Sequence, residues 1–531
     1  MTGALVGTGP LIRLALRRDR IILPIWIVLL SIVPVATISS YDQFYPTAAS
    51  RAGLVASAAA NPSFALLYGP AFNLGTAGGF IAWRMGGFLA LLTGLMAVFT
   101  LTRHTRAEED SGRAELLAST VVGRYAPLTA ALAVTGGASV LIGVLQASTL
   151  ASKVPAAGSV ALGASTALAG LVFTGVAAVA AQLGEYSRTA NGIGTAVLGV
   201  AFLLRGAGDS TTDAHWLSWL SPLGWAQQIR PFAEERWWVL ILPVATTLVL
   251  FAVAYALLPR RDVGVGLLPP RLGPSVAAPS LRSPFSLAWR LQRGPLLGWL
   301  VGLAVGGALF GTIAQGISGL VGGTEQSRQI FERLGGSRGL VDAFLATMVS
   351  LFAMLASLYG VQATLRMRTE ETSLRLEPLL ATRVGRLRWA ASHLVFAFVG
   401  SAVLVLVGGV LLGLSNGLRG GDVGRSVGNM VEAVAVQVPA AWVIVAVAAL
   451  IFGLLPKLAT AAWGVAALAL LISMFGPVVN APQVLLDVSP FQHPPKVPGQ
   501  LFTAVPLVVL LAVSAVVLAT GLAGWRRRDV G

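Results

Sequence analysis

Several residue types that build chemical sites are missing or rare in this sequence. The 531 residues include no cysteine, which excludes disulfide bonds, a thiol nucleophile and cysteine metal ligands. The four histidines, His104, His215, His393 and His493, are scattered, and no pair has the spacing of metal ligands. We therefore predict no metal site.

Lysine is equally scarce. None of Lys153, Lys457 and Lys496 lies in a Gly-x-x-x-x-Gly-Lys-Ser/Thr loop, so the sequence lacks the phosphate cradle of an ATPase. It also lacks the cluster of His, Asp or Glu at one interface that a lipid-modifying membrane enzyme would need. We expect a chain without catalytic residues and without a cofactor of its own.

Charge is low and hydrophobicity is high. Only 11% of the residues are charged, 55% are hydrophobic, and the mean hydropathy is +0.78. A helix needs about 20 apolar residues to cross a bilayer, and such runs recur along the chain. The composition thus predicts an all-α polytopic membrane protein. The net charge of +15 is explained by arginines on cytoplasmic loops, and we expect no nucleic-acid partner.

The apolar runs predict twelve membrane-spanning helices. They cover residues 21–39, 79–101, 126–149, 159–182, 190–204 and 237–258, and then 295–316, 343–365, 389–414, 431–455, 459–477 and 501–524. Before the first helix, Pro10–Arg20 forms a basic amphipathic stretch that we expect to lie flat at the inner surface. Residues 40–78 are expected to form a long outer loop. Prolines and tryptophans before the sixth helix predict short helices that dip into the outer leaflet.

The two sets of six helices are copies of one plan. Each set ends on the sequence RRDVG, at 260–264 and at 527–531, and other matched features recur at offsets between 262 and 273 residues. We predict a first half at 1–264, a Pro-rich cytoplasmic linker at 265–284, and a second half at 285–531. Six helices per half make the repeats parallel. Placing both termini in the cytoplasm puts 25 of the 37 lysines and arginines on that side.

A charge-dense segment follows the second helix of each half. We call residues 106–124 (RAEEDSGRAELLASTVVGR) the first charged segment and residues 368–386 (RTEETSLRLEPLLATRVGR) the second. In the first, we predict a helix from about Thr105 that places Glu108, Gly112 and Glu115 on one face. Its acidic side would face outward to recognise a partner. The alternative is a solvated loop that only sets topology.

This pattern resembles the coupling helix of ABC-2-type permeases. Glu108, Gly112, Glu115, Leu116, Leu117 and Arg124 carry the resemblance, and the fused halves look most like actinobacterial exporters of polyketide antibiotics of the tetronasin type. The second copy departs from the pattern, with Leu374 for Gly112 and Pro378 for Leu116. The partner-coupling residues that the resemblance implies are Glu108, Glu109, Gly112, Arg113, Glu115, Arg124, Glu370, Glu371, Arg375, Glu377 and Arg386.

The resemblance also implies the partners. An ATP-driven exporter of this kind would use two copies of a separate cytoplasmic ATPase subunit, which would bind ATP and Mg²⁺. The chain itself would lie in the bacterial plasma membrane, in contact with lipid, and export hydrophobic compounds such as antibiotics or drugs. The alternative is a proton-coupled secondary multidrug transporter, which the scarcity of intramembrane carboxylates disfavours.

A few residues within the predicted helices are candidates for a substrate pathway. Trp83 and Arg84 lie in the second helix, and ionisable groups within membrane segments are functional candidates by default. The eighth helix carries side chains that suit variable apolar molecules, namely Phe344, Met348, Phe352 and Tyr359. The alternatives are snorkelling of Arg84 to the interface and ordinary packing of the apolar side chains.

Overall fold

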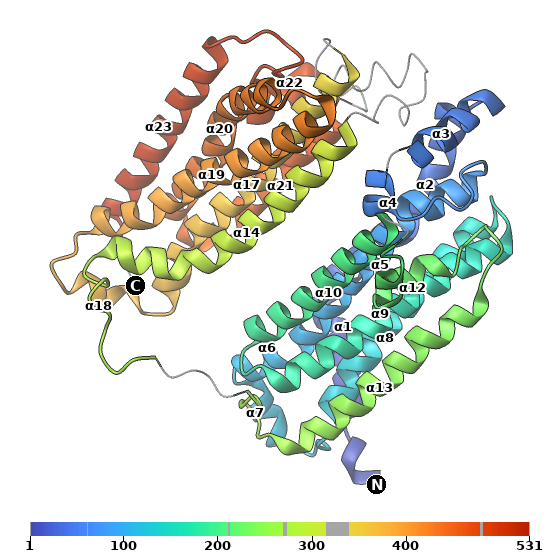
Figure 1. The fold of residues 1–531 in the computed structure, drawn as a ribbon. Helices are drawn as coiled ribbons and strands as arrows, with labels where there is room; N and C mark the ends of the chain where they lie inside the picture. The colour runs from blue at the N-terminus through green and yellow to red at the C-terminus, as the bar shows by residue number, and fades with distance from the viewer. Residues whose placement is uncertain are drawn as a thin grey trace. The chain divides into compact units, whose positions relative to one another are not determined.

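The computed structural model describes residues 2–60, 62–210, 213–268, 273–314, 339–477 and 482–529. Within these ranges every regular element is a helix. The chain divides into two compact units, Met1–Gly273 and Pro274–Gly531, each of which is described by itself (Figure 1). The division falls within the predicted linker, whose residues 269–272 lie outside the described part.

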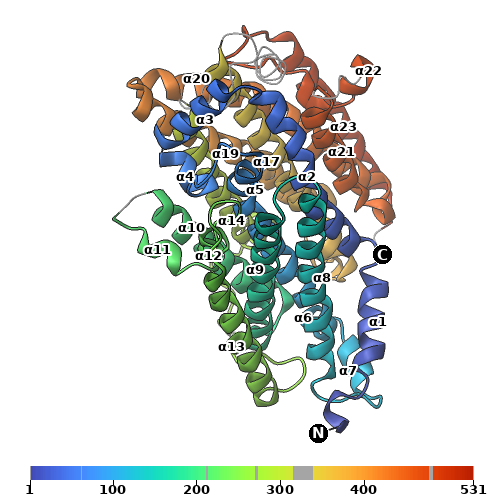
Figure 2. The same cartoon turned by 90° about the vertical axis from the view of Figure 1, so that its right-hand side faces the viewer.

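Unit 1 is a bundle of long helices with short helices at both ends (Figure 2). Its α-helices are α1 (Thr8–Arg18), α2 (Ile22–Phe44), α3 (Ala48–Ala60), α4 (Pro62–Tyr68), α5 (Ala77–His104), α6 (Arg106–Asp110), α7 (Arg113–Ala118), α8 (Ala126–Ala151), α9 (Ala156–Leu183), α10 (Ser187–Ser210), α11 (Trp216–Trp219), α12 (Pro222–Gln228) and α13 (Ile241–Leu257). The 3₁₀ helices are η1 (Thr2–Leu5), η2 (Trp237–Leu240) and η3 (Leu258–Arg260). The predicted outer loop 40–78 thus contains the end of α2 and the helices α3 and α4.

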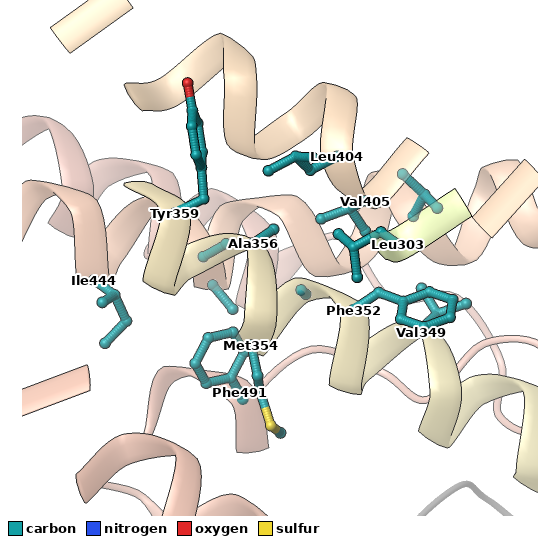
Figure 3. Close-up of a cluster of buried hydrophobic side chains, with 14 of the residues drawn as sticks. Leu303, Val349, Phe352, Met354, Ala356, Tyr359, Leu404, Val405, Ile444 and Phe491 are labelled. Atoms are coloured by element: carbon teal, nitrogen blue, oxygen red, sulfur yellow. The ribbon is translucent and has the colours of Figure 1, made fainter. Parts of the chain in front are cut away.

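The described residues of unit 2 form fewer short helices than those of unit 1. Its α-helices are α14 (Pro284–Ala314), α17 (Leu340–Thr372), α18 (Leu376–Leu380), α19 (Arg386–Gly420), α20 (Val423–Leu454), α21 (Ala461–Phe475), α22 (Gln483–Leu486) and α23 (Val505–Arg527). The 3₁₀ helices are η4 (Pro456–Leu458) and η5 (Pro490–Gln492). A large apolar core lies between α14, α17, α19 and α20, and Figure 3 shows part of it.

Glycines set the closest helix contacts in both units. A Cβ on Gly143 of α8 would lie 2.3 Å from the carbonyl oxygen of Gly163 in α9. In unit 2, a Cβ on Gly453 of α20 would lie 2.0 Å from the carbonyl oxygen of Gly521 in α23. No real side chain fits at these distances, so the backbones touch directly. Small residues at such crossings are typical of membrane helices, where van der Waals contact drives association.

The chain is a multi-pass membrane protein. In the part that the structure describes, eleven helices are long and apolar enough to cross a bilayer. The predicted helix at 459–477 is occupied by α21, an apolar helix of 15 residues, which is shorter than a bilayer normally requires. The twelve-helix layout therefore stays a prediction.

The two units differ where the first membrane helix begins. In unit 1, α1 ends at Arg18 and α2 begins at Ile22. Asp19, buried in the turn between them, forms an ion pair with Arg103 at 2.7 Å and a hydrogen bond with His104 at 2.8 Å. In unit 2 the corresponding stretch is one continuous helix, α14, which has Pro295 inside it.

Candidate functional site

The first charged segment forms two short helices. α6 ends at Asp110 and α7 begins at Arg113, and Gly112 between them has φ +71°. This left-handed conformation breaks a right-handed helix and suits glycine. The prediction of one helix carrying Glu108, Gly112 and Glu115 on a single face is therefore wrong. The segment packs on the N-terminus, where Gly123 N–H donates to the Val6 carbonyl at 2.8 Å.

The second charged segment repeats this backbone path. α17 continues to Thr372, and α18 begins at Leu376. Leu374, the counterpart of Gly112, has φ +56°. The chain therefore turns in the same left-handed way although this residue carries a side chain, at a conformational cost that glycine avoids.

Glu109 is held inside unit 1 by the residues after α13. The two Nη atoms of Arg261 donate to its two carboxylate oxygens at 2.9 and 2.7 Å. Gly264 N–H donates to it at 3.0 Å, and Arg106 does so at 2.8 Å. Arg106 is completely buried and also donates to the Val265 carbonyl at 3.1 Å. Bidentate charge-assisted contacts of this kind are the strongest hydrogen bonds in proteins.

Glu371 is held in the same way in unit 2. The Nη atoms of Arg528 donate to its two oxygens at 2.7 and 2.9 Å, and Arg368 forms an ion pair with it at 2.9 Å. Arg261 and Arg528 are the second arginines of the two RRDVG sequences, and Glu109 and Glu371 are matched positions of the charged segments. We call Glu109–Arg261 and Glu371–Arg528 the arginine latches of unit 1 and unit 2.

The neighbouring carboxylates are also paired within the chain. Glu108 forms ion pairs with Arg18 of α1 and, at 3.0 Å, with Arg113. Its counterpart Glu370 pairs with Arg366 at 2.8 Å and with Arg375 at 3.9 Å.

These pairings correct the expectation of an outward acidic face. The four carboxylates Glu108, Glu109, Glu370 and Glu371 have side chains that are at most 13% exposed. A carboxylate taken out of water needs a partner charge, and arginines of the same unit supply it. The exposed acids of the two segments are Asp110 and Glu115 in the first and Glu377 in the second.

The arginines that close the charged segments contact the last helix of their unit. Arg124 Nη2 donates to the Pro259 carbonyl at 3.0 Å, just beyond α13. Arg386 Nη1 donates to the Arg528 carbonyl at 2.7 Å, just beyond α23. The last carbonyls of a helix lack intrahelical donors, so a guanidinium is a favourable partner for them.

The middle of each segment projects from the unit. Leu116 is 71% exposed and Val121 is 87% exposed, although both are apolar. We call the exposed residues of this region the tips. The tip of unit 1 comprises Glu115, Leu116 and Val121, and that of unit 2 comprises Leu374, Glu377, Pro378 and Arg383. Gly112, Arg113 and Arg375 lie where each tip begins.

Comparison with known proteins decides the family. A family model described as "Multidrug efflux system permease Rv1217c, C-terminal domain" matches residues 12–258 and 281–526. The multidrug efflux system permease protein Rv1217c of Mycobacterium tuberculosis (strain ATCC 25618 / H37Rv) is 48% identical over 529 residues, which cover 99% of this chain and 95% of that protein. The chain belongs to the Rv1217c family of multidrug efflux permeases.

Membership in the Rv1217c family confirms the prediction of an efflux permease. It supports multidrug export and not the specific features of the tetronasin type. The finer assignment to polyketide-antibiotic exporters, like the nature of the energy source, stays a prediction.

A cavity lies behind the first charged segment of this Rv1217c-family permease. Its volume is about 390 Å³, which is within the range of small-molecule sites. Leu11, Leu14 and Leu128 line it with apolar surface, and Arg18 and Arg261 line it with charge. In unit 2, a cavity of about 280 Å³ is bordered by Tyr359, Gln362, Trp463 and other residues. Both cavities lie within single units.

Asp19 is a buried carboxylate in the turn between α1 and α2, outside the membrane-spanning segments. Burial raises the pKa of its carboxyl, but the hydrogen bonds from His104 and Arg103 outweigh that effect, so the pKa lies below its ordinary value of 3.8. Asp19 is therefore ionised at neutral pH. It ties the turn between α1 and α2 to the end of α5.

The candidate pathway residues of unit 1 pack against their own unit. Trp83 is buried, and its Nε1 donates to the Gly69 carbonyl at 2.9 Å. The Arg84 guanidinium lies 5.6 Å from the Phe80 ring centroid. Trp83 borders a cavity of about 20 Å³, which has room for about one water molecule.

The candidates in unit 2 belong to its apolar core. Phe344, Phe352 and Tyr359 are buried there, and Met348 is partly buried and packs against the same core. Figure 3 shows Phe352 and Tyr359 among their neighbours. Tyr359 also borders the 280 Å³ cavity, and its hydroxyl donates to the Phe396 carbonyl at 3.3 Å. Of these four residues, Tyr359 is the one that both packs and lines a cavity.

The sequence analysis missed Arg261 and Arg528 as functional candidates. Their signal was visible, because RRDVG occurs at the end of each half. It served only as evidence of duplication. Ser221 and Ser489 are a second matched pair at the opposite end of the units. Their hydroxyls donate to the carbonyls of Ala201 and Ala469 at 2.6 and 3.0 Å.

Proposed function

We propose that this chain is the permease subunit of an ATP-driven exporter of hydrophobic compounds, including drugs. A separate cytoplasmic ATPase, present as two copies, would bind ATP and Mg²⁺ and contact one tip of each half. The permease would lie in the bacterial plasma membrane, with both termini and both charged segments in the cytoplasm.

The observation that carries the proposal is the construction of the charged segments. In both units the base of the segment is fixed by ion pairs, while the tip projects with apolar and charged side chains exposed. Leu116 and Val121 gain no free energy from exposure to water. They do gain free energy when a partner covers them, at about 25 cal/mol per Å² of apolar surface.

Two further observations support a separate motor. The sequence has no phosphate-binding loop. The Rv1217c relative is described as the permease of a multidrug efflux system, and a permease of a system implies other components. Driving a two-state transporter from about 1:99 to 99:1 takes roughly 5.5 kcal/mol of differential binding, which a nucleotide-driven partner can supply.

The experiment co-expresses the chain with candidate ATPase subunits and alters both tips. The variant combines L116S and V121S with E377A and R383A. We expect it to lose co-purification with the ATPase and ATP-dependent efflux together. V484S is the matched control, because Val484 is also an apolar residue, 81% exposed, on the short helix α22, away from the charged segment of its own unit (Figure 1).

Two results would contradict the proposal. One is a tip variant that keeps both ATPase binding and transport at the level of V484S. The other is efflux by the unaltered chain that collapses with the proton gradient while ATP remains, which would favour the secondary transporter.

A further inference from the structure

We infer that the arginine latches of Arg261 and Arg528 carry movement of the charged segments into the last membrane helix of each half. The inference rests on the proposed function for the origin of the movement. It adds a route, namely α13 in unit 1 and α23 in unit 2, and it makes the two arginines positioning residues for coupling.

The first support is that each segment is attached to the last helix at two points. In unit 1, Glu109 before the tip binds Arg261, and Arg124 after the tip binds the Pro259 carbonyl. The tip lies between these attachments along the chain. A push on the tip therefore cannot turn the segment about a single contact, and the end of α13 has to follow.

The second support is that unit 2 repeats both attachments. Glu371 binds Arg528, and Arg386 binds the carbonyl of the same residue, Arg528. The tips of the two units differ in sequence, because Pro378 replaces Leu116 and Arg383 replaces Val121. The two attachments are thus the same in both units, although the exposed tips differ. If the attachments served only local stability, there would be no reason for them to match between the units while the tips differ.

The third support is the burial of the latches. Both partners in each unit are at most 16% exposed. The Arg528 guanidinium also lies over two rings, 5.0 Å from the Phe452 centroid and 4.7 Å from the Trp525 centroid. Separating a buried pair would leave a charge without its partner, so the latch holds firmly while the segment moves.

The route continues into each bundle through close packing. α13 lies against α9, where a Cβ on Gly175 would come 2.7 Å from Leu250 Cβ. α23 lies against α20, where the backbones of Gly453 and Gly521 touch. Tightly packed helices slide or tilt together and do not deform independently. Displacement of the last helix would therefore reach the core of its unit.

The test is the double variant R261Q/R528Q, reconstituted with the ATPase. We expect the complex to assemble and to hydrolyse ATP, while drug transported per ATP falls about tenfold, within the usual range of coupling between sites. A merely structural role would lower assembly and transport together. The matched control is R260Q/R527Q. It alters the neighbouring arginines of both RRDVG sequences, which are exposed and have no ion pair among the described residues.

A crosslinking experiment distinguishes loss of the latch from misfolding of the variants. Because the chain has no cysteine, R124C/P259C introduces the only two thiols, one on the segment and one beside α13. In an R261Q background, a reducible dithiol linker between them should restore transport per ATP, and reduction should abolish it again. The latch is overturned if R261Q/R528Q transports like R260Q/R527Q, or if the linked protein stays uncoupled.

The latch and the proposed function fail in different experiments. If efflux by the unaltered chain does not depend on ATP, the proposed function is wrong. The latch is then tested by comparing efflux by R261Q/R528Q with efflux by R260Q/R527Q. If ATP drives the unaltered chain and the latch variants keep full coupling, only the latch is wrong.

Discussion

Leu374 offers the sharpest quantitative test of how the charged segments are built. It has φ +56° and is 65% exposed. A non-glycine residue in the left-handed region costs roughly 1–2 kcal/mol, whereas glycine costs roughly 0.5–1 kcal/mol of chain entropy on folding. Because little apolar contact is lost, L374G should stabilise the protein by about 0.5–1 kcal/mol.

The reciprocal change should have the opposite sign. No atom lies within 4 Å of where a Cβ on Gly112 would be, so G112L meets only the backbone cost and should destabilise by about the same amount. Both changes are measured as shifts in the thermal midpoint of the purified protein in detergent. L374A is the control, because alanine keeps the left-handed strain and should bring no gain.

The outcome bears on function as well as on stability. An exposed, strained leucine at a tip is a place where contact with a partner would compensate for lost stability. We expect L374G to be more stable and less active in ATP-dependent efflux. A midpoint below that of the wild type, or equal gains for L374G and L374A, would refute the reasoning.

Three other changes test single interactions. R261K keeps the charge but loses the bidentate contact with Glu109, and R261Q, which leaves Arg106 as the charge partner of that carboxylate, should cost about 1–3 kcal/mol in thermal unfolding. D19N should lower the midpoint at neutral pH. Because the pKa of Asp19 is depressed in the folded protein, this difference should shrink as the pH falls below the ordinary value of 3.8 and vanish once the pH lies below the depressed pKa. K496M should raise the midpoint at neutral pH, since burial lowers the pKa of Lys496 to about 8. Its advantage should shrink as the pH rises above that value, when the native lysine becomes neutral.

The long helices could be predicted from sequence because apolar runs report directly on membrane crossing. α8 spans Ala126–Ala151 where 126–149 was expected, and α9 spans Ala156–Leu183 where 159–182 was expected. The same signal predicted a helix at 459–477, where α21 spans Ala461–Phe475. Whether this shorter helix crosses the membrane stays a prediction. The signal gave no sign of α3 and α4, whose residues read as an outer loop.

The partners of the charged side chains could not be predicted. Glu109 and Arg261 are 152 residues apart in the sequence, and nothing local to either residue indicates the other. The acids of the segment looked available to a partner because sequence shows charge but not burial. The break at Gly112 had a local signal, since an interior glycine weakens a helix, but the amphipathic spacing around it was given more weight.

The pathway residues illustrate a third limit. Aromatic and methionine side chains are equally suited to a binding surface and to a core. For Phe352, the surrounding helices place it in the core.

The glycine contact between α20 and α23 has a consequence for how the half could open. Helices whose main chains touch have almost no rotamer freedom at the crossing, so they cannot relax by repacking side chains. Any rearrangement there has to move both helices together as a rigid body, or separate them against the dispersion attraction summed along their length. Replacing Gly453 or Gly521 with a larger residue would thus force α20 and α23 apart, at a point where the packing leaves no space for a side chain.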